Sequence, residues 1–393
     1  MKILKLRISG SRGWLTVSVA AALTVALAAC SSSSNTSSSP GGSKGPITLG
    51  ASIVLSGANA YVGQNILNGL KLGIAKVNAD GGVLGGRQLK LTTVDDGCDP
   101  GTAVTAVKKL ISDSVPAIFA PGCSGAALAQ MAQIKASQIP FLVSDASNAQ
   151  ITADAGVGGN KYTWRINADD SVIADGFSKY IAKNTGTIAA IAEDDDFGRG
   201  GVSVYQKSLP ANNVQMVSAQ YYTPGLADFR PLLAKIQSEH PAGLLLIMEP
   251  KDAATLIRQI KQVGLTAKIY GRGFISPEFT TALGDASLAN GIVGADFWAV
   301  GMDPSFDAAY KAAYKTEPPP DSAGPYNAAL VMAKAIDLGG GATSAAIQKG
   351  MSQLDIKVGW GPVKFDDHDQ AHPNVVLEEI VGGTVKILSS TPS

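Results

Sequence analysis

The sequence has 393 residues, more than the roughly 100–200 of a single domain, so we expect two or three domains. Hydrophobic residues make up 45% and charged residues 16%, proportions that exclude an intrinsically disordered chain. Lysine and arginine together number 32, as do aspartate and glutamate, so the chain lacks the basic excess of a nucleic-acid-binding protein.

The first 29 residues have the layout of a secretory signal peptide. Residues 1–12 carry four basic side chains and no acidic one, and residues 14–29 are apolar or small. These 16 residues fall short of the roughly 20 that cross a bilayer as a helix. Residues 27–30, Leu-Ala-Ala-Cys, resemble a bacterial lipobox, in which the cysteine becomes the lipidated first residue of the mature chain. We therefore predict lipidation at Cys30 and a protein anchored to the cell membrane on its extracytoplasmic face.

Residues 30–46 follow as a tether that is rich in serine and glycine and has almost nothing to bury. Such a segment is flexible and spans about 20 Å on average. Removal of the first 29 residues leaves 28 basic and 32 acidic side chains, a net charge of −4. We do not expect so small a net charge to steer a strongly charged ligand.

Two cysteines remain when Cys30 carries the lipid. Cys98 and Cys123 form an even pair in an oxidising compartment, and a bridge between them would close a loop of about 25 residues. Closing a loop of this length stabilises by roughly 3 kcal/mol. Two unpaired buried thiols are the alternative.

From residue 47 onward, short apolar runs alternate with segments of helical periodicity. In the first half we predict strands at 47–55, 88–94, 117–120 and 141–144, and helices at 63–79, 100–111 and 124–137. The alternation of apolar runs and helical segments begins again after Trp164. There we predict helices at 171–183, 200–209, 229–238 and 253–263, and strands at 188–192, 214–221 and 243–248. The remainder is predicted to hold helices at 307–314 and 326–338 and strands around 363–365 and 375–381.

Repeated strand–helix units predict parallel sheets covered by helices on both faces, in two α/β domains. Ligands of such sheets bind beyond the carboxyl ends of the strands. This rule selects the loops at 56–61, 95–99, 121–125, 144–148, 193–199, 249–252 and 271–274.

Two serines in these loops are candidates for binding a carboxylate. Ser124 begins a predicted helix, where backbone N–H groups and the helix dipole favour an anion. Serine at this position is also a common helix cap, and Ser147 is open to the same two interpretations. The aspartates at 194–196 follow a strand and are candidates for binding an ammonium group. Tyr61 and Phe197 lie in the same set of loops, where a ring can close over an apolar ligand.

No residue pattern typical of an enzyme occurs. Residues 122–125, Gly-Cys-Ser-Gly, are one residue short of the G-x-S-x-G nucleophile elbow, and the chain has no HExxH, Walker or CxxC motif. The segment 365–373 contains three aspartates and two histidines, which are metal-ligand residue types. We interpret it as a solvated turn between two strands. We therefore expect a protein that is not an enzyme and holds no metal or cofactor.

Five segments together resemble one known family, the extracytoplasmic solute-binding proteins of the leucine/isoleucine/valine-binding type, which are partners of ABC importers. The residues that carry the likeness are LSGANAYVGQNILNGLKLGIAKVNADGGVLGGRQLKLTTVDDGCDP at 55–100, APGCSGAALA at 120–129, FLVSDASNAQIT at 141–152, EDDDFGRGG at 193–201 and ADFRPLLAKI at 227–236. The resemblance covers nearly the whole chain after residue 47.

The resemblance implies two doubly wound α/β lobes, joined by a hinge of three crossovers, as in type I periplasmic binding proteins. Lobe 1 would comprise 47–167 and 295–360, and lobe 2 would comprise 168–294 and 361–393. The final crossing is therefore expected near residue 361.

The resemblance also implies roles for individual residues. Cys98 and Cys123 match the family's disulfide, and Ser124 matches the serine that binds the ligand's α-carboxylate. Ala146 and Ser147 match the residues that hold the ligand's carboxylate and ammonium. The resemblance further implies that Phe197 packs on the ligand and that Tyr61 lies within one residue of another site aromatic.

One departure concerns the family's ammonium-binding acid. The loop at 271–274 reads Gly-Arg-Gly-Phe and contains no acid. Glu249 or an aspartate of 194–196 is the candidate replacement, with Arg272 as the candidate partner of Glu249.

The resemblance implies a lipid-anchored, monomeric solute-binding component of an ABC importer. Its expected ligand is a small carboxylate-bearing solute, by default a branched-chain or related amino acid. The alternatives are a ligand-binding sensor of the same fold and a binder of an amide, urea or an aromatic acid.

Overall fold

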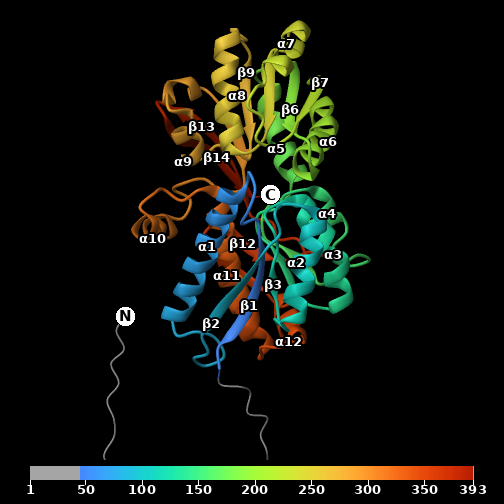
Figure 1. Cartoon of the computed structure of the whole chain (residues 1–393), viewed down its shortest axis with the longest axis vertical. Helices are drawn as coiled ribbons and strands as arrows, with labels where there is room; N and C mark the ends of the chain where they lie inside the picture. The colour runs from blue at the N-terminus through green and yellow to red at the C-terminus, as the bar shows by residue number, and fades with distance from the viewer. Residues whose placement is uncertain (1–44, 393) are drawn as a thin grey trace, which may run out of the picture. The chain divides into compact units, whose positions relative to one another are not determined.

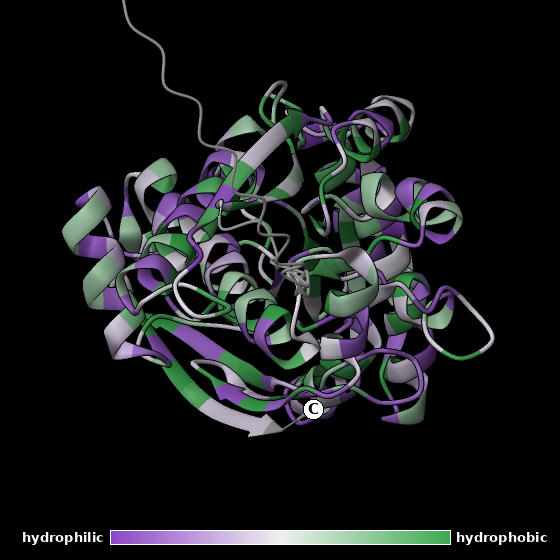
Figure 2. Cartoon of the chain, turned by 90° about the horizontal axis from the view of Figure 1, so that it is seen from below, coloured by the Kyte–Doolittle hydropathy of each residue, from purple (hydrophilic) through white to green (hydrophobic). Residues whose placement is uncertain are grey.

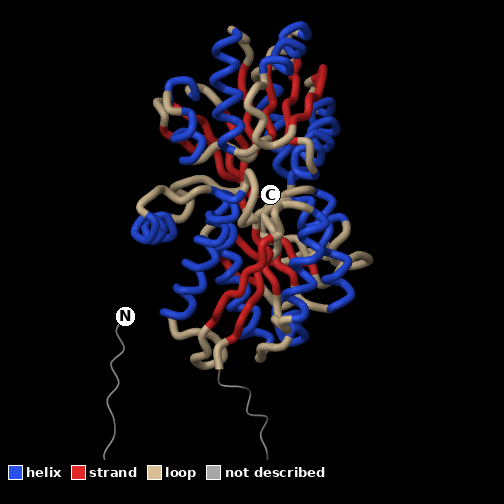
Figure 3. Tube along the Cα trace, viewed as in Figure 1, coloured by secondary structure: helices blue, strands red, loops and turns tan. Residues whose placement is uncertain are grey.

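The computed structural model describes residues 45–392 (Figure 1). The predicted signal peptide, the lipidation site at Cys30 and most of the predicted tether lie outside these residues. Within them, two large sheets and one small hairpin are flanked by helices (Figure 3).

The first sheet is parallel and has the strand order β2-β1-β3-β4-β5. Its strands are β1 (Ile47–Ile53), β2 (Leu89–Asp95), β3 (Ile118–Phe119), β4 (Phe141–Val143) and β5 (Thr163–Arg165). The helices between them are α1 (Ala60–Ala79), α2 (Pro100–Ser112), α3 (Ser124–Ser137) and α4 (Ala149–Ala153).

The second sheet has the order β14-β13-β10-β9-β8-β6-β7. Five parallel strands come first in the chain: β6 (Thr187–Glu193), β7 (Gln215–Tyr222), β8 (Gly243–Ile247), β9 (Lys268–Arg272) and β10 (Val293–Asp296). The antiparallel pair β13 (Asn374–Val381) and β14 (Thr384–Pro392) extends this sheet beyond β10. The helices of this half are α5 (Asp170–Ala182), α6 (Asp196–Ala211), α7 (Arg230–Glu239), α8 (Pro250–Val263), α9 (Pro277–Leu283) and the 3₁₀ turn Ala286–Ala289.

The two sheets repeat one topology. If the parallel strands of each are numbered in chain order, both run 2-1-3-4-5, which is a doubly wound arrangement with a switch point beside the first strand. The fold class is therefore the one predicted. The strands β5, β9 and β10 were not predicted, because each is short and contains a charged residue, so no continuous apolar run marks it.

Chain segments from the end of the sequence complete the first half. The helix α11 (Pro320–Gly339) packs along α1, and α12 (Ser344–Met351) packs on α11. Gly69 of α1 permits the close approach, since a Cβ atom there would lie 2.1 Å from the carbonyl oxygen of Ser322. Helix α11 begins six residues before its predicted start and holds Pro325 inside it. The helix α10 (Pro304–Tyr314) precedes α11.

The predicted third crossing is misplaced. The strand β12 (Gly361–Lys364) pairs with β11 (Asp355–Val358) in a separate hairpin, and the following residues bond to the first sheet. The Arg165 N–H donates to the Asp369 carbonyl (2.9 Å), and the Ala371 N–H donates to the Arg165 carbonyl (2.8 Å). The chain therefore reaches the second sheet at β13 and not near residue 361.

The segment 365–373 is also less solvated than expected. Gln370 is buried, accepts a hydrogen bond from Nε of Arg165 (2.8 Å) and donates one to the Asn167 carbonyl (2.8 Å). Asp366 pairs with His372 at 3.1 Å on the exposed side. The segment thus fastens the end of β5, and only part of it is a solvated turn.

The core lies between the sheets and their helices. In β8, the side chains of Leu244, Leu245, Leu246 and Ile247 are completely buried, as both faces of the sheet are covered. Figure 2 shows hydrophobic and hydrophilic residues alternating along the helices, the pattern of helices with one buried face. Within residues 45–392 no single helix has the length and apolarity to cross a membrane; α11 and α12 meet that criterion only as a pair, bent by 105°.

Candidate ligand-binding pocket

A pocket lies where the carboxyl ends of the strands in both sheets meet. Its walls carry residues that directly follow β3, β4, β6, β8, β9 and β10, together with the start of α1 and of α11. Including the part open to solvent, it encloses about 580 Å³. The lining residues are Asn59, Val62, Cys98, Gly122, Cys123, Ser124, Asp145, Ser147, Asp195, Phe197, Glu249, Arg272, Gly273, Asp296, Phe297, Pro320 and Asp321.

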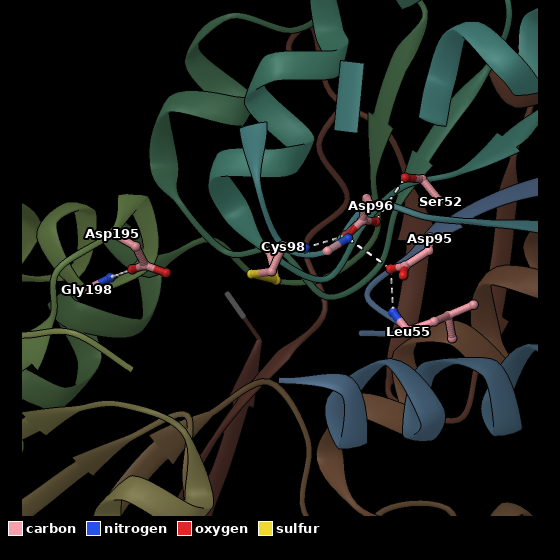
Figure 4. The surroundings of a disulfide bond; sticks show 9 residues. Ser52, Leu55, Asp95, Asp96, Cys98, Asp195 and Gly198 are labelled. Atoms are coloured by element: carbon pink, nitrogen blue, oxygen red, sulfur yellow. Dashed lines mark hydrogen bonds between the residues drawn. A yellow bond between two sulfur atoms is a disulfide. The ribbon is translucent and has the colours of Figure 1, made fainter. Parts of the chain in front are cut away.

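A disulfide closes one side of this pocket. Cys98 and Cys123 are bonded, as predicted, and join the loop after β2 to the start of α3 (Figure 4). The loop is fixed by two carboxylates: Asp96 accepts from the Cys98 N–H (2.9 Å), and Asp95 accepts from the N–H groups of Leu55 (2.8 Å) and Gly97 (2.9 Å). Cys98 has a φ of +57°, so these bonds hold a backbone conformation that a non-glycine residue seldom adopts.

Ser124 lies at the first residue of α3 but does not cap the helix. Its hydroxyl oxygen accepts a hydrogen bond from the Asn148 N–H (3.3 Å), so the loops after β3 and β4 are tied together. The first turn of α3 has N–H groups without partners inside the helix, as every helix start does.

Two carboxylates of the protein itself lie against this turn. A Cβ atom at Gly122 would lie 2.7 Å from Oδ2 of Asp145, and one at Gly125 would lie 2.5 Å from Oδ2 of Asp196. Glycine at both positions therefore admits an acidic side chain, one from the first half of the chain and one from the second.

Arg272 is buried and paired on two sides. Its guanidinium lies 3.0 Å from Oδ1 of Asp170 and 3.2 Å from Oδ2 of Asp296. The rings of Phe197 and Phe297 lie 5.6 and 5.7 Å from its Cζ. The expected pairing of Arg272 with Glu249 is therefore wrong, because Asp170 and Asp296 occupy the guanidinium.

Ser147 belongs to the same network. Its hydroxyl donates to Oδ2 of Asp170 (3.1 Å), so its oxygen keeps only acceptor capacity for a ligand. A ligand N–H group meets that requirement, whereas a ligand carboxylate does not.

The remaining carboxyl groups of the pocket are poorly solvated. Burial, together with the nearby charge of Asp296, raises the pKa of Asp145 to about 7. Burial raises the pKa of Glu249 well above its usual range, and the charges of Glu193, Asp321, Asp145 and Asp195 add to the effect. In the described part of the chain, no hydrogen bond or ion pair reaches the side-chain carboxyl groups of Asp145 and Glu249.

Two neighbouring carboxyl groups behave in the same way. Burial and the charge of Asp145 raise the pKa of Asp321 well above its usual range. Burial and the charge of Asp195 raise the pKa of Glu193 to about 8, while its carboxylate accepts from the Glu249 N–H (2.9 Å) and the Tyr222 hydroxyl (3.2 Å).

Five of the seven residues predicted for the site line the pocket: Ser124, Ser147, Phe197, Glu249 and Arg272. Tyr61 lines a neighbouring pocket, which shares Asn59 and Glu249 with the first, and its ring lies 3.9 Å from the ammonium of Lys251. Ala146 is buried outside the lining, where its carbonyl accepts from Nδ2 of Asn167 (3.1 Å).

Sequence reasoning did not single out Asp145, Asp296 or Asp321. Asp145 lies inside a loop that the strand rule had selected, so that signal was available. Asp296 ends a strand that was not predicted. Asp321 comes from the start of α11, which is distant in sequence from every other acid of the pocket.

Among the aspartates of 194–196, only Asp195 lines the pocket. It caps α6 by accepting from the Gly198 N–H (2.9 Å), a bond that Figure 4 shows. Asp194 is exposed and pairs with Arg199. Within residues 45–392, no three His, Cys, Asp or Glu side chains are grouped so that they could hold a metal ion.

Comparisons with known proteins agree with this architecture. The family profile described as periplasmic binding protein matches residues 46–383. A Leu/Ile/Val-binding protein of Rhizobium johnstonii is 24% identical over 278 residues, which is 70% of each chain. A leucine-, isoleucine-, valine-, threonine- and alanine-binding protein of Pseudomonas aeruginosa is 25% identical over 329 residues, 82% of this chain and 84% of its own.

Solved structures share the fold. The solute-binding protein of an ABC transporter from R. palustris, in complex with benzoate, matches with a TM-score of 0.80 at 22% identity, over 88% of this chain and 97% of its own. A branched-chain amino acid transporter substrate-binding protein of Streptococcus pneumoniae, in complex with isoleucine, matches with a TM-score of 0.78 at 21% identity, over 88% and 99%. Identities this low show a common fold and leave the ligand open.

The match over residues 46–383, the two doubly wound sheets and the pocket at their carboxyl ends lead to one conclusion. The chain belongs to the periplasmic binding protein family, as an extracytoplasmic solute-binding protein of the Leu/Ile/Val-binding type that serves ABC importers.

Proposed function

We propose that this protein captures a small amino-bearing solute, by default an amino acid, in the pocket between its two sheets. The observation that supports this ligand class is the presence of two half-buried carboxyl groups in the pocket wall, on Asp145 and Glu249, without a partner among the described residues. A buried carboxylate is stable only when it is paired or hydrogen-bonded, and a ligand ammonium supplies both.

Glu249 is the proposed replacement for the acid that the loop at 271–274 lacks. It follows β8 and faces the pocket from the second half of the chain, while Ser124 and the start of α3 face it from the first half. If the ligand has an α-carboxylate, Ser124 is its proposed binding residue, since its hydroxyl hydrogen is not used by its bond from Asn148. Phe197 and Phe297 are the proposed contacts of the apolar part.

Thermal shift with a ligand panel tests this proposal. The panel holds amino acids, amines, urea, amides and aromatic acids, each at 100 times its dissociation constant, where binding stabilises by about 2.7 kcal/mol. For 348 described residues, that corresponds to a rise in melting temperature of about 4 °C. A rise with amino-bearing solutes supports the proposal. A rise restricted to acids without an amino group, such as benzoate, contradicts it.

Two variants identify the site. We expect Glu249→Gln to abolish the shift given by an amino-bearing ligand, because it removes the proposed partner of the ammonium. We expect Ser124→Ala to weaken the binding of an amino acid by roughly 1–3 kcal/mol, the usual effect of removing one hydrogen bond to a charged group. Asp355→Asn, which changes an acid exposed on β11, serves as the control. An unchanged affinity in both site variants would place the ligand elsewhere.

The membrane anchor is part of the same proposal. We propose that Cys30 carries a lipid and that the tether holds the binding domain close to the permease as a monomer. Replacement of Cys30 by serine is expected to release the protein from the membrane fraction. Retention of the Cys30→Ser variant in that fraction would refute the lipid anchor.

A further inference from the structure

The pocket carries far more negative than positive charge. Its walls hold five carboxyl groups, those of Asp145, Asp195, Glu249, Asp296 and Asp321. Its one cation within the described residues is Arg272, which Asp170 and Asp296 already pair. No charge of Arg272 is left over to balance the other carboxyl groups.

Two acidic side chains also lie at the start of α3, where a helix would otherwise favour an anion. The carboxylates of Asp145 and Asp196 lie against Gly122 and Gly125, at and before the first turn of α3. A ligand carboxylate that approaches this turn meets these two like charges. Ser147 also favours a cationic group over a carboxylate, because its hydroxyl already donates to Asp170 and can only accept a hydrogen bond from a ligand.

The two carboxyl groups without a partner face the pocket from different halves of the chain. Asp145 follows β4 of the first sheet, and Glu249 follows β8 of the second. Asp145 lies close enough to Glu249 for its charge to raise the pKa of Glu249. Ionised together, they repel one another, so a ligand that places positive charge between them favours their ionised forms.

We propose that the ligand carries two cationic nitrogen groups, one bound by Asp145 and the other by Glu249, and that it thereby ties the two halves of the protein together. The ligand is then a diamine or an amino acid with a cationic side chain. Val62, Phe197, Phe297 and Pro320 contact its methylene chain. The inference rests on the proposed function, because it concerns the same pocket.

Calorimetric titration with matched ligands tests the charge requirement. The probes are L-ornithine and L-lysine, the diamine putrescine, L-leucine as an amino acid with one cationic group, and benzoate as an anion. We expect ornithine, lysine or putrescine to bind at least tenfold more tightly than leucine. If ornithine binds and putrescine does not, the α-carboxylate contributes; if both bind, the two nitrogen groups are sufficient. Either result supports the two-cation requirement.

The failure of this inference differs from the failure of the proposed function. Leucine binding as tightly as every dication would overturn the inference and leave the amino-bearing ligand intact. Binding of benzoate alone would overturn both. Failure of every dication to bind, whatever else binds, also rules out the inference.

Variants test whether each half contributes one contact. We expect Asp145→Asn and Glu249→Gln each to weaken the binding of the dication at least tenfold, since each removes one of the two charge partners. Both changes relieve repulsion between half-buried carboxyl groups, so the melting temperature without ligand is expected to stay level or rise. Asp355→Asn is the control at an exposed site. If either site variant keeps full affinity at an unchanged melting temperature, that residue does not bind a cationic group and the inference fails.

Discussion

Arg272 offers a direct test of how the pocket is held. Its guanidinium is buried between Asp170 and Asp296, at 3.0 and 3.2 Å, and all three side chains are at most 6% exposed. Arg272→Met keeps the length and apolar stem of the side chain and removes the charge, so two buried carboxylates lose their partner. Breaking a buried ion pair from one side costs about 3–5 kcal/mol.

The expected shift follows from the size of the protein. At about 2.1 cal/mol/K per residue, unfolding of the 348 described residues has an entropy of about 0.7 kcal/mol/K. The melting temperature of Arg272→Met should therefore fall by about 4–7 °C in differential scanning calorimetry at pH 7.5. Burial raises the pKa of Asp170 and of Asp296 and the arginine opposes this, so without the arginine both carboxyl groups take up protons more readily. The deficit should shrink when the measurement is repeated at pH 5.

The control is Arg230→Met, since Arg230 pairs with Asp228 at the surface at 2.7 Å. We expect no measurable change in this variant, because exposed pairs contribute little to stability. A fall of less than 1 °C in Arg272→Met, or a fall equal to that of the control, would show that the buried cluster does not stabilise the fold.

Four other predictions concern the framework and the charges. Replacement of Cys98 and Cys123 by alanine is expected to lower the free energy of unfolding by about 3 kcal/mol and the melting temperature by about 4 °C, because the disulfide no longer restricts a loop of about 25 residues in the unfolded chain. An unchanged melting temperature would show that the disulfide is dispensable. Gly69→Ala should lower the melting temperature, because the new Cβ atom meets the Ser322 carbonyl oxygen. Gly176→Ala should raise it, because Gly176 lies in the middle of α5 with open space around the position of a Cβ atom. Equal effects of the two substitutions would contradict the close packing of α1 on α11. Glu193 has a pKa of about 8 in the folded protein against an ordinary value of 4.5, so between these pH values the folded state binds more protons and the group makes stability fall as the pH rises. Glu193→Gln should therefore lose less stability than the wild type between pH 5 and 8 in calorimetric scans. Parallel losses in the two proteins would refute the raised pKa of Glu193. The pKa of Asp145 is about 7 in its surroundings, where Asp296, Arg272, Asp321 and Glu249 are the nearby charged groups. The affinity for a dication should therefore rise from pH 5.5 to 7.5 as the Asp145 carboxyl group ionises. A falling affinity over this range would indicate an anionic ligand.

Much of the fold is predictable because it depends on local patterns. The helix starting at Pro100 is signalled by Asp99 followed by proline, and Asp99 does accept from the Thr102 N–H (2.7 Å). The parallel strands β1, β6 and β8 read as apolar runs because both faces of a covered sheet are buried. The third crossing was misplaced because Arg165 and Gln370, 205 residues apart, bond to each other, and no local pattern reports such a contact.

The site residues, too, were predictable where local position decides them and not where distant contacts do. Ser124, Ser147, Phe197, Glu249 and Arg272 were found because residues after parallel strands share one edge of a sheet. Tyr61 lies in the first turn of α1 and Ala146 in the loop after β4, and both lie outside the pocket lining because neighbouring residues point in different directions. The partners of Arg272 were predicted wrongly, because sequence proximity to the cleft does not reveal which carboxylate reaches a guanidinium.

The sequence by itself determined the repeated strand–helix units, the disulfide pair and the edge of each sheet at which the pocket lies. These features follow from residue periodicity, cysteine count and strand direction, all of which are properties of short segments. Only the tertiary structure decided the charge of the pocket. A net charge of −4 spread over the chain after residue 29 says nothing about where the acids gather, and the fold brings Asp145, Glu249 and Asp321 together from three distant segments. Burial then raises the pKa of all three carboxyl groups, because the low-dielectric interior replaces the water that would otherwise stabilise their charges.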